Sequence, residues 1–208
     1  MGQSILVADD HPLFRQALVM AARSVCPEAK IVEVGTLATA AHAAAETDDL
    51  TLILLDLKMP GANGYSGVAL LHAERPSVPI LVISSAKSAT AVSDARRFGA
   101  VGFIGKEQDL SVIEVAIADA LSGGSLKGPS DPELDEVAQH VASLTPTQLR
   151  VLLGLLAGKL NKQIAYDMGI SEATVKAHMT AIMRKLDVQN RTQAVLVARA
   201  LGLGIEHD

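Results

Sequence analysis

Aromatic residues are scarce in this chain of 208 residues, which contains three Phe, two Tyr and no Trp. Because 49% of the residues are nevertheless hydrophobic, the core must be packed mainly from Ala, Leu, Val and Ile. No apolar run reaches the roughly 20 residues that a membrane-spanning helix needs. No basic segment precedes the first apolar run. We therefore expect neither a signal peptide nor a membrane partner.

Cysteine and positive charge are also limited, each in a way that bears on function. The lone cysteine, Cys26, excludes an internal disulfide and fits a reducing compartment, so we expect a cytoplasmic protein. Residues 1–143 carry 10 Lys and Arg against 18 Asp and Glu, whereas residues 144–208 carry eight against five. An acidic first part joined to a basic second part indicates two roles, the second close to phosphate groups.

Short apolar runs alternate with helical patterns over the first part of the chain. The runs at 4–9, 30–34, 50–56, 79–84 and 101–105 read as strands, and helices are expected at 12–25, 37–46, 65–74, 89–97 and 109–122. This alternation predicts an α/β fold, a doubly wound, five-stranded parallel sheet over residues 1–122. We expect the common strand order 2-1-3-4-5.

The second part of the chain has only helical periodicity. Glycine and proline mark a linker at 123–143, in which 135–143 is predicted to form a short helix. Residues 144–208 are then expected to form a small all-α domain with helices at 145–157, 161–168, 171–186 and 192–201. Thr145 and Gln148 have the spacing of a capping box. The short glycine-containing turn between the second and third of these helices is typical of a helix-turn-helix.

Acidic residues follow two strands that should be neighbours. The apolar run 52–55 ends on Asp56, and burying such a carboxylate without a partner is costly. Asp9 and Asp10 follow the first strand, whose carboxyl end should lie beside that of the third. Three close carboxylates repel one another, and a hard divalent cation such as Mg²⁺ removes the repulsion. The sequence therefore predicts a magnesium site that includes Asp56.

The fourth and fifth predicted strands add a hydroxyl and an ammonium group to this edge. Ser84 ends the fourth strand, and Lys106 follows the fifth. Together with the acids and a metal, these groups can receive a phosphoryl group on Asp56. Two simpler interpretations stay open. Asp10 can cap the helix that begins at Pro12, and Asp56 can simply begin a loop.

As an ordered set, these residues resemble the signature of the receiver domain of two-component response regulators, and "LLDLKMPGANG" resembles its phosphoacceptor segment. The resemblance implies a flavodoxin-like fold with Asp56 as phosphoacceptor. Asp10, Asp56 and the main-chain carbonyl of Lys58 would ligate Mg²⁺, and Asp9 would help through water. Ser84 would bind a phosphoryl oxygen, Lys106 would pair with its charge, and Phe103 would be the switch aromatic or an ordinary core residue.

The helix expected at 171–186 separates apolar from outward-facing positions. At 100° per residue, Val175, Met179, Ile182 and Leu186 share one stripe. The opposite face carries Lys176, Ala177, Thr180, Ala181 and Arg184. Small side chains flanked by cations suit a helix in a DNA major groove, and Lys162, Lys185 and Arg191 add charge for phosphates. A solvated helix face in a protein-binding bundle is the alternative.

The segments "NKQIA", "ISEATVKAH" and "KLDVQNRTQA" resemble the LuxR-type DNA-binding domain of NarL/FixJ response regulators. The resemblance places Lys176, Ala177 and Thr180 at bases, and Asn161, Thr174 and His178 at or near the backbone. From their charge we also expect Lys162 and Arg184 to contact DNA. Leu160 stands where the family has a small polar residue, which removes one backbone contact. The helix at 192–201 resembles the one that pairs two such domains on DNA.

The sequence thus predicts a DNA-binding transcriptional regulator, not an enzyme in the usual sense. A sensor histidine kinase would phosphorylate Asp56 with Mg²⁺, and the receiver would then release the basic domain, dimerise, or both. Three alternatives remain: a regulator that binds DNA without phosphorylation, a metal-dependent phosphatase with Asp56 as nucleophile, and a second domain that binds protein.

Overall fold

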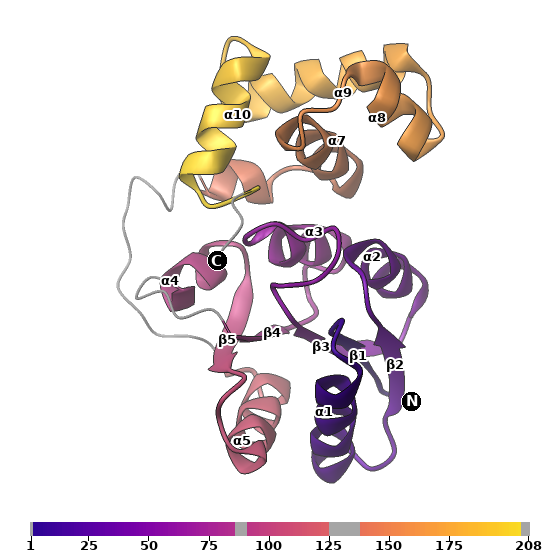
Figure 1. Cartoon of the computed structure of the whole chain (residues 1–208), viewed down its shortest axis with the longest axis vertical. Coiled ribbons are helices and arrows are strands. Elements are labelled where there is room, and N and C mark those ends of the chain that lie inside the picture. The colour runs from indigo at the N-terminus through magenta and orange to yellow at the C-terminus, as the bar shows by residue number, and fades with distance from the viewer. Residues whose placement is uncertain (1, 86–90, 125–137, 205–208) are drawn as a thin grey trace.

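The computed structural model describes residues 2–85, 91–124 and 138–204 and contains an α/β domain and a helical domain (Figure 1). The elements of the first domain are β1 (Ser4–Ala8), α1 (Pro12–Val25), β2 (Lys30–Val34), α2 (Leu37–Glu46), β3 (Leu50–Leu55), α3 (Ser66–Glu74), β4 (Ile80–Ser84), α4 (Ala91–Arg97), β5 (Ala100–Gly105) and α5 (Leu110–Leu121). Those of the second are α7 (Pro146–Leu156), α8 (Asn161–Met168), α9 (Glu172–Lys185) and α10 (Arg191–Ala200).

All five strands are parallel and lie in the order β2-β1-β3-β4-β5. The predicted doubly wound α/β fold is therefore confirmed. Because β1 and β3 are direct neighbours, the residues that follow them meet at one edge of the sheet. Helix α4 begins at Ala91 in the described part of the chain, and residues 89–90 of the predicted helix lie outside it.

The sheet is covered on both faces, which is why its central strands are apolar throughout. Ile5 and Val7 point into a core formed with α1 and α5. Leu6 and Ala8, one residue out of phase, point into a second core formed with α2 and α3. Figure 1 shows α1 and α5 on one side of the sheet and α2 and α3 on the other, with the helical domain stacked beyond α2 and α3. The small alanine side chains of the covering helices let these helices pack closely on the sheet, so the core is dense although it contains few aromatic rings.

The helices of the second domain begin and end at residue types that commonly cap helices. Thr145 and Gln148 form the predicted capping box at α7, and Ser171 accepts a bond from the main chain of Thr174 at the start of α9. Gly169, with φ of 64°, ends α8 in the left-handed region. Asn190 caps α10, so this helix begins and ends one residue earlier than predicted. Of the predicted linker helix, 138–142 are helical and 135–137 lie outside the described residues.

The two domains are docked through α3 and α7. Arg150 of α7 pairs with Glu74 of α3, and one continuous apolar cluster extends from α2 and α3 into the helical domain. Beyond α10, Leu203 is fully buried and forms a β-bridge with Gly64. Gly64 lies in the loop between β3 and α3, so the segment just beyond α10 contacts the segment that follows the third strand. No helix in the described part of the chain is long and apolar enough to cross a membrane.

Tyr65 lies at this junction of the domains. Its ring is 1% exposed and stacks on Phe98, with ring centroids 6.0 Å apart, while its main-chain nitrogen donates to Gly202. Burial, reinforced by the negative charge of Asp94, raises the pKa of Tyr65 to about 12. The phenol of Tyr65 should therefore report whether the domains are docked.

Replacing Tyr166 with Phe leaves Tyr65 as the only tyrosine, so tyrosinate absorbance then follows a single group. We expect a pKa of about 12 in the folded variant and about 10 in denaturant. Because the pKa is raised in the folded state, the associated stability is full below pH 10 and is lost as pH rises from about 10 towards 12. A folded-state midpoint at the denatured value would contradict the burial of this ring.

Candidate functional site

Three carboxylates meet beyond the carboxyl ends of β1 and β3. Asp9 and Asp56 have side chains that are 0% and 1% exposed, and that of Asp10 is 31% exposed. The main-chain nitrogen of Asp56 donates to Ala8, which extends the pairing of β3 with β1 and brings the acids together. The structure thus assembles the acidic cluster that strand order predicts.

Lys106 supplies the only positive charge that the described residues place between two of these acids. Its Nζ lies 2.7 Å from Asp56 Oδ2 and 2.7 Å from Asp9 Oδ2. It also lies 4.7 Å from the centre of the Phe14 ring, a cation–π contact. The ammonium is itself largely buried, so these interactions are weakly screened by solvent.

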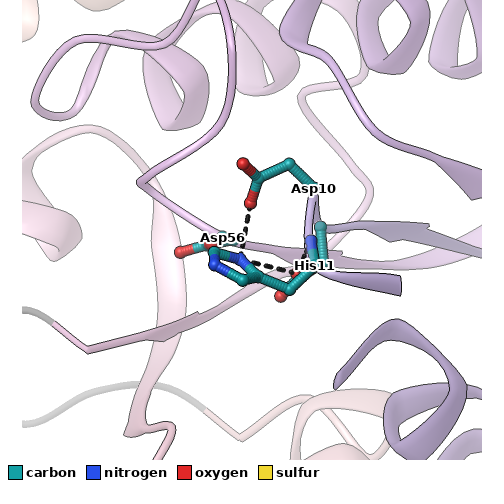
Figure 2. A group of neighbouring side chains, drawn as sticks. Asp10, His11 and Asp56 are labelled. Atoms are coloured by element: carbon teal, nitrogen blue, oxygen red, sulfur yellow. Dashed lines mark hydrogen bonds and ion pairs between the residues drawn. The ribbon is translucent and has the colours of Figure 1, made fainter. Parts of the chain in front are cut away.

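The interpretation of Asp10 as a helix cap is wrong. The N-cap of α1 is His11, and no side chain caps this helix. The main-chain nitrogen of His11 instead donates to Asp9 Oδ1 at 2.8 Å. Pro12 at the first helical position lacks an N–H, which reduces the need for a cap. Asp10 consequently keeps its carboxylate for the cluster, where it lies with His11 beside Asp56 (Figure 2).

The other predicted receiver residues, Lys58, Ser84 and Phe103, differ in how directly they contact Asp56. The main-chain nitrogen of Lys58 donates to Asp56 Oδ1 at 3.1 Å, while the Lys58 residue is exposed. Ser84 is fully buried at the end of β4, and its carbonyl accepts from the main-chain nitrogen of Lys106. Phe103 is half-buried and packs against the core shared with the helical domain. Asp56 does begin the loop after β3, as the simpler interpretation has it, but its buried carboxylate also accepts hydrogen bonds from the main chain of Lys58 and from Lys106 Nζ.

The donor set fits a divalent cation. Three carboxylates face one ammonium group, which leaves two formal negative charges without compensation among these residues. Asp10 Oδ1 is enclosed and accepts no hydrogen bond within the described part of the chain. Carboxylate oxygens are the ligands that Mg²⁺ prefers. Asp10, Asp56 and the main-chain carbonyl of Lys58 are the groups that would hold it, with Asp9 behind them.

Helix α9 presents most of the predicted outward face, although Ala181 is partly buried. Val175, Met179 and Ile182 are buried against the other helices, and Lys176, Ala177 and Thr180 are exposed. Lys176 pairs loosely with Glu172 one turn earlier, and the Thr180 hydroxyl donates to the carbonyl of Lys176. Lys162, Thr174 and Arg184 are also exposed, whereas Asn161 and His178 are partly buried. The docked α/β domain packs on α7, so it leaves this face of α9 open.

Two family models match the chain. "Response regulator receiver domain" matches residues 5–118, and "Bacterial regulatory proteins, luxR family" matches residues 142–198. The chain is a response regulator. Its second domain is of the LuxR type, as in NarL/FixJ response regulators, and it belongs to the transcriptional regulators.

Several relatives of this response regulator align over most of their length. The Glycerol metabolism activator of Pseudomonas putida is 40% identical, with 93% of this chain and 94% of the relative covered. The Nitrate/nitrite response regulator protein NarP of Escherichia coli is 31% identical, with 93% of each covered. Full-length FixJ from B. japonicum has the same fold, with a TM-score of 0.51, 24% identity, and coverage of 96% of this chain and 97% of that one.

Some residues of the response regulator's sites could not be assigned from sequence. Lys185 was expected to add charge for DNA phosphates, but its ammonium donates to the carbonyl of Ser143 and to Gln148 Oε1, so its role is to join helices. Phe14 and His11 at the acidic cluster were missed. The signal for Phe14 was its place four residues after Asp10 at the start of a helix, where side chains point back towards the preceding strand end. The signal for His11 was only that it follows Asp10 directly.

Proposed function

We propose that this response regulator accepts a phosphoryl group on Asp56 from a sensor histidine kinase and then binds DNA as a dimer. The observation that carries the proposal is the arrangement around Asp56: a buried carboxylate at 2.7 Å from Lys106 Nζ, with Asp9 and Asp10 beside it. A transferred phosphoryl group would add roughly 1.5 to 2 negative charges at this point. Lys106 is already in place to pair with them.

In the reaction, a carboxylate oxygen of Asp56 attacks phosphorus as the N–P bond of a kinase phosphohistidine breaks. An O–P bond forms, giving an acyl phosphate, and the released imidazole takes up a proton. Mg²⁺ held by Asp10, Asp56 and the carbonyl of Lys58, with Asp9 acting through water, would neutralise charge on the phosphoryl oxygens. The Ser84 hydroxyl is expected to donate to one of those oxygens, and Lys106 to pair with another.

The loop after β3 supports a route from Asp56 to the second domain. This loop runs from Asp56 to Tyr65, and Tyr65 contacts Gly202 just beyond α10. Its hydroxyl also donates to the carbonyl of Ala91 in α4, at 3.4 Å. A shift of Ser84 and Lys106 towards the phosphoryl group would move β4 and β5 relative to this loop, with Phe103 repacking at β5. The docking of α10 would then be weakened.

The exposure of α9 favours control through dimerisation over control by unmasking. In the docked arrangement Lys176, Ala177 and Thr180 already face solvent, so a single domain can approach DNA without release. We propose that these residues contact bases, and that Asn161, Lys162, Thr174, His178 and Arg184 contact or approach the backbone. Docking restrains the end of α10, the helix proposed to pair two copies. Phosphorylation would then promote the pairing of two copies through α10. Two DNA-binding domains that are linked in this way bind two half-sites more tightly than separate domains, because each raises the effective concentration of the other at the DNA.

The test compares a duplex with one half-site and a duplex with two, both derived from a sequence that the protein selects from random DNA. With Mg²⁺ and beryllofluoride as phosphoryl mimic, we expect wild-type affinity for the double site to rise about tenfold or more, and mass in solution to double. Affinity for the single site should stay constant. Asp56→Ala should abolish the rise, and Lys176→Ala should weaken binding to both duplexes with or without the mimic.

Two other outcomes of this comparison point elsewhere. If Asp56→Ala left the rise intact, the phosphorylation-independent regulator would be the better description. If the mimic raised affinity for the single half-site as strongly as for the double site, release of a masked helix would replace dimerisation. Since its relatives are transcriptional regulators, we do not propose the phosphatase alternative.

A further inference from the structure

His11 brings a nitrogen atom into a site otherwise made of oxygen. The imidazole Nδ1 lies 2.7 Å from Asp10 Oδ1 and 3.7 Å from Asp9 Oδ1, as Figure 2 shows for the contact with Asp10. One ligand atom from each of Asp9, Asp10, His11 and Asp56 lies within 4.8 Å of the others. The imidazole is 66% exposed, so no packing forces it into this position.

The contact between His11 and Asp10 is close but lacks the alignment of a hydrogen bond. Asp10 Oδ1 accepts no hydrogen bond in the described part of the chain, although Nδ1 is 2.7 Å away. Two ligand atoms at adjacent positions on one octahedral ion also lie close together without a hydrogen bond between them, because each points at the ion and not at the other. With metal–ligand distances near 2.1 Å, such neighbours are about 3.0 Å apart, close to the separation found here.

We propose that His11 Nδ1 is a metal ligand of this site, so that the site binds borderline divalent transition metals with a nitrogen donor that Mg²⁺ does not use. This inference rests on the proposed metal site at Asp56. Mg²⁺ prefers oxygen ligands and keeps its waters, whereas imidazole suits Fe²⁺, Ni²⁺ and Zn²⁺. Asp10 and Asp56 would serve both classes of metal, and His11 would decide between them.

Titration calorimetry on the tag-free full-length protein with Ni²⁺ and with Mg²⁺ separates these ligands. In wild type the affinity ratio of Ni²⁺ to Mg²⁺ should exceed that of His11→Gln by about tenfold or more, because a directly bound ligand is worth at least as much as an outer-shell partner. The matched control is His42→Gln, which removes an exposed histidine of α2 whose Nε2 pairs with Glu46. Its ratio should equal that of wild type.

Pulsed electron paramagnetic resonance with one equivalent of Cu²⁺, an ion that imidazole also suits, gives a second, direct readout. Coupling of the copper electron spin to an imidazole nitrogen is expected in wild type and in His42→Gln, and its loss is expected in His11→Gln. Equal affinity ratios in wild type and His11→Gln, or no nitrogen coupling in wild type, would overturn the assignment of His11. Asp10→Asn should weaken Ni²⁺ and Mg²⁺ together. If it weakened neither, the proposed metal site itself, and not only His11, would be wrong.

Discussion

Replacing Lys106 with Met is expected to lower the free energy of unfolding by about 3–5 kcal/mol in a metal-free buffer. The substitution removes the ammonium group that lies 2.7 Å from both Asp9 and Asp56 and leaves two buried carboxylates facing each other. Methionine retains most of the side-chain volume and the contact with Phe14, so loss of packing should contribute little. Urea unfolding in EDTA measures the effect.

Two comparisons separate charge from other causes. Lys159→Met removes a lysine that pairs at 2.7 Å with Asp167, but both side chains are nearly half exposed. That pair should be worth about 1 kcal/mol or less. Millimolar Mg²⁺ should restore part of the stability of Lys106→Met, because a cation among the acids replaces the missing charge. If both lysine variants lost the same amount, the buried acids would not be the reason.

Opening of the docked domains is the second large effect, and Leu203→Asp is expected to cause it. Leu203 is fully buried where it bridges Gly64, and a carboxylate there is costly unless the interface separates. In the Tyr166→Phe background, the pKa of Tyr65 should fall from about 12 towards 10 as the ring becomes exposed. The radius of gyration from X-ray scattering should rise at the same time.

The consequence for DNA binding follows from the restraint on α10. Without the phosphoryl mimic, Leu203→Asp should bind the double half-site between about 5- and 150-fold more tightly than wild type, the usual range of coupling between sites. Leu160→Asp, an equal change at a leucine that is 65% exposed, should leave the pKa of Tyr65 and the radius of gyration unchanged. Opening without a gain in affinity would mean that docking does not restrain pairing.

A milder variant guards against misfolding of Leu203→Asp. Glu74→Lys places a second cation beside Arg150 and should also expose Tyr65, though less completely. Combining it with Arg150→Glu restores opposite charges and should restore the docked state. A double variant that stayed open would show that the ion pair is not part of the docking.

The first domain was predictable in detail because its constraints are local and repetitive. Strands such as 52–55 are apolar throughout, helices such as α5 have one apolar stripe, and parallel strands must be joined by crossovers. Strand order then brings Asp56 beside Asp9 and Asp10. The buried stripe of α9, from Val175 to Leu186, was also predictable from a local pattern, because its apolar residues recur with the 3.6-residue period of a helix.

Other side chains depended on contacts that no local pattern contains. Asp10 has the type of side chain and nearly the position that a helix N-cap requires. His11 is nevertheless the N-cap, because the main chain enters the helix one residue later. Lys185 resembles a phosphate-binding cation, yet its ammonium donates to Ser143 and Gln148, which lie 42 and 37 residues away in the chain. Such competition between partners is decided by three-dimensional neighbours.

The sequence by itself determined the parallel sheet, the acidic edge around Asp56 and the exposed face of α9, because periodicity and strand order follow from residue spacing. Only the tertiary structure decided that α7 packs on α3, that the segment just beyond α10 covers Tyr65, and that His11 turns towards Asp10. These arrangements depend on which surfaces meet, and surfaces of similar composition can meet in several ways. The docking of Leu203 on the loop that begins at Asp56 is therefore a property of the folded molecule alone.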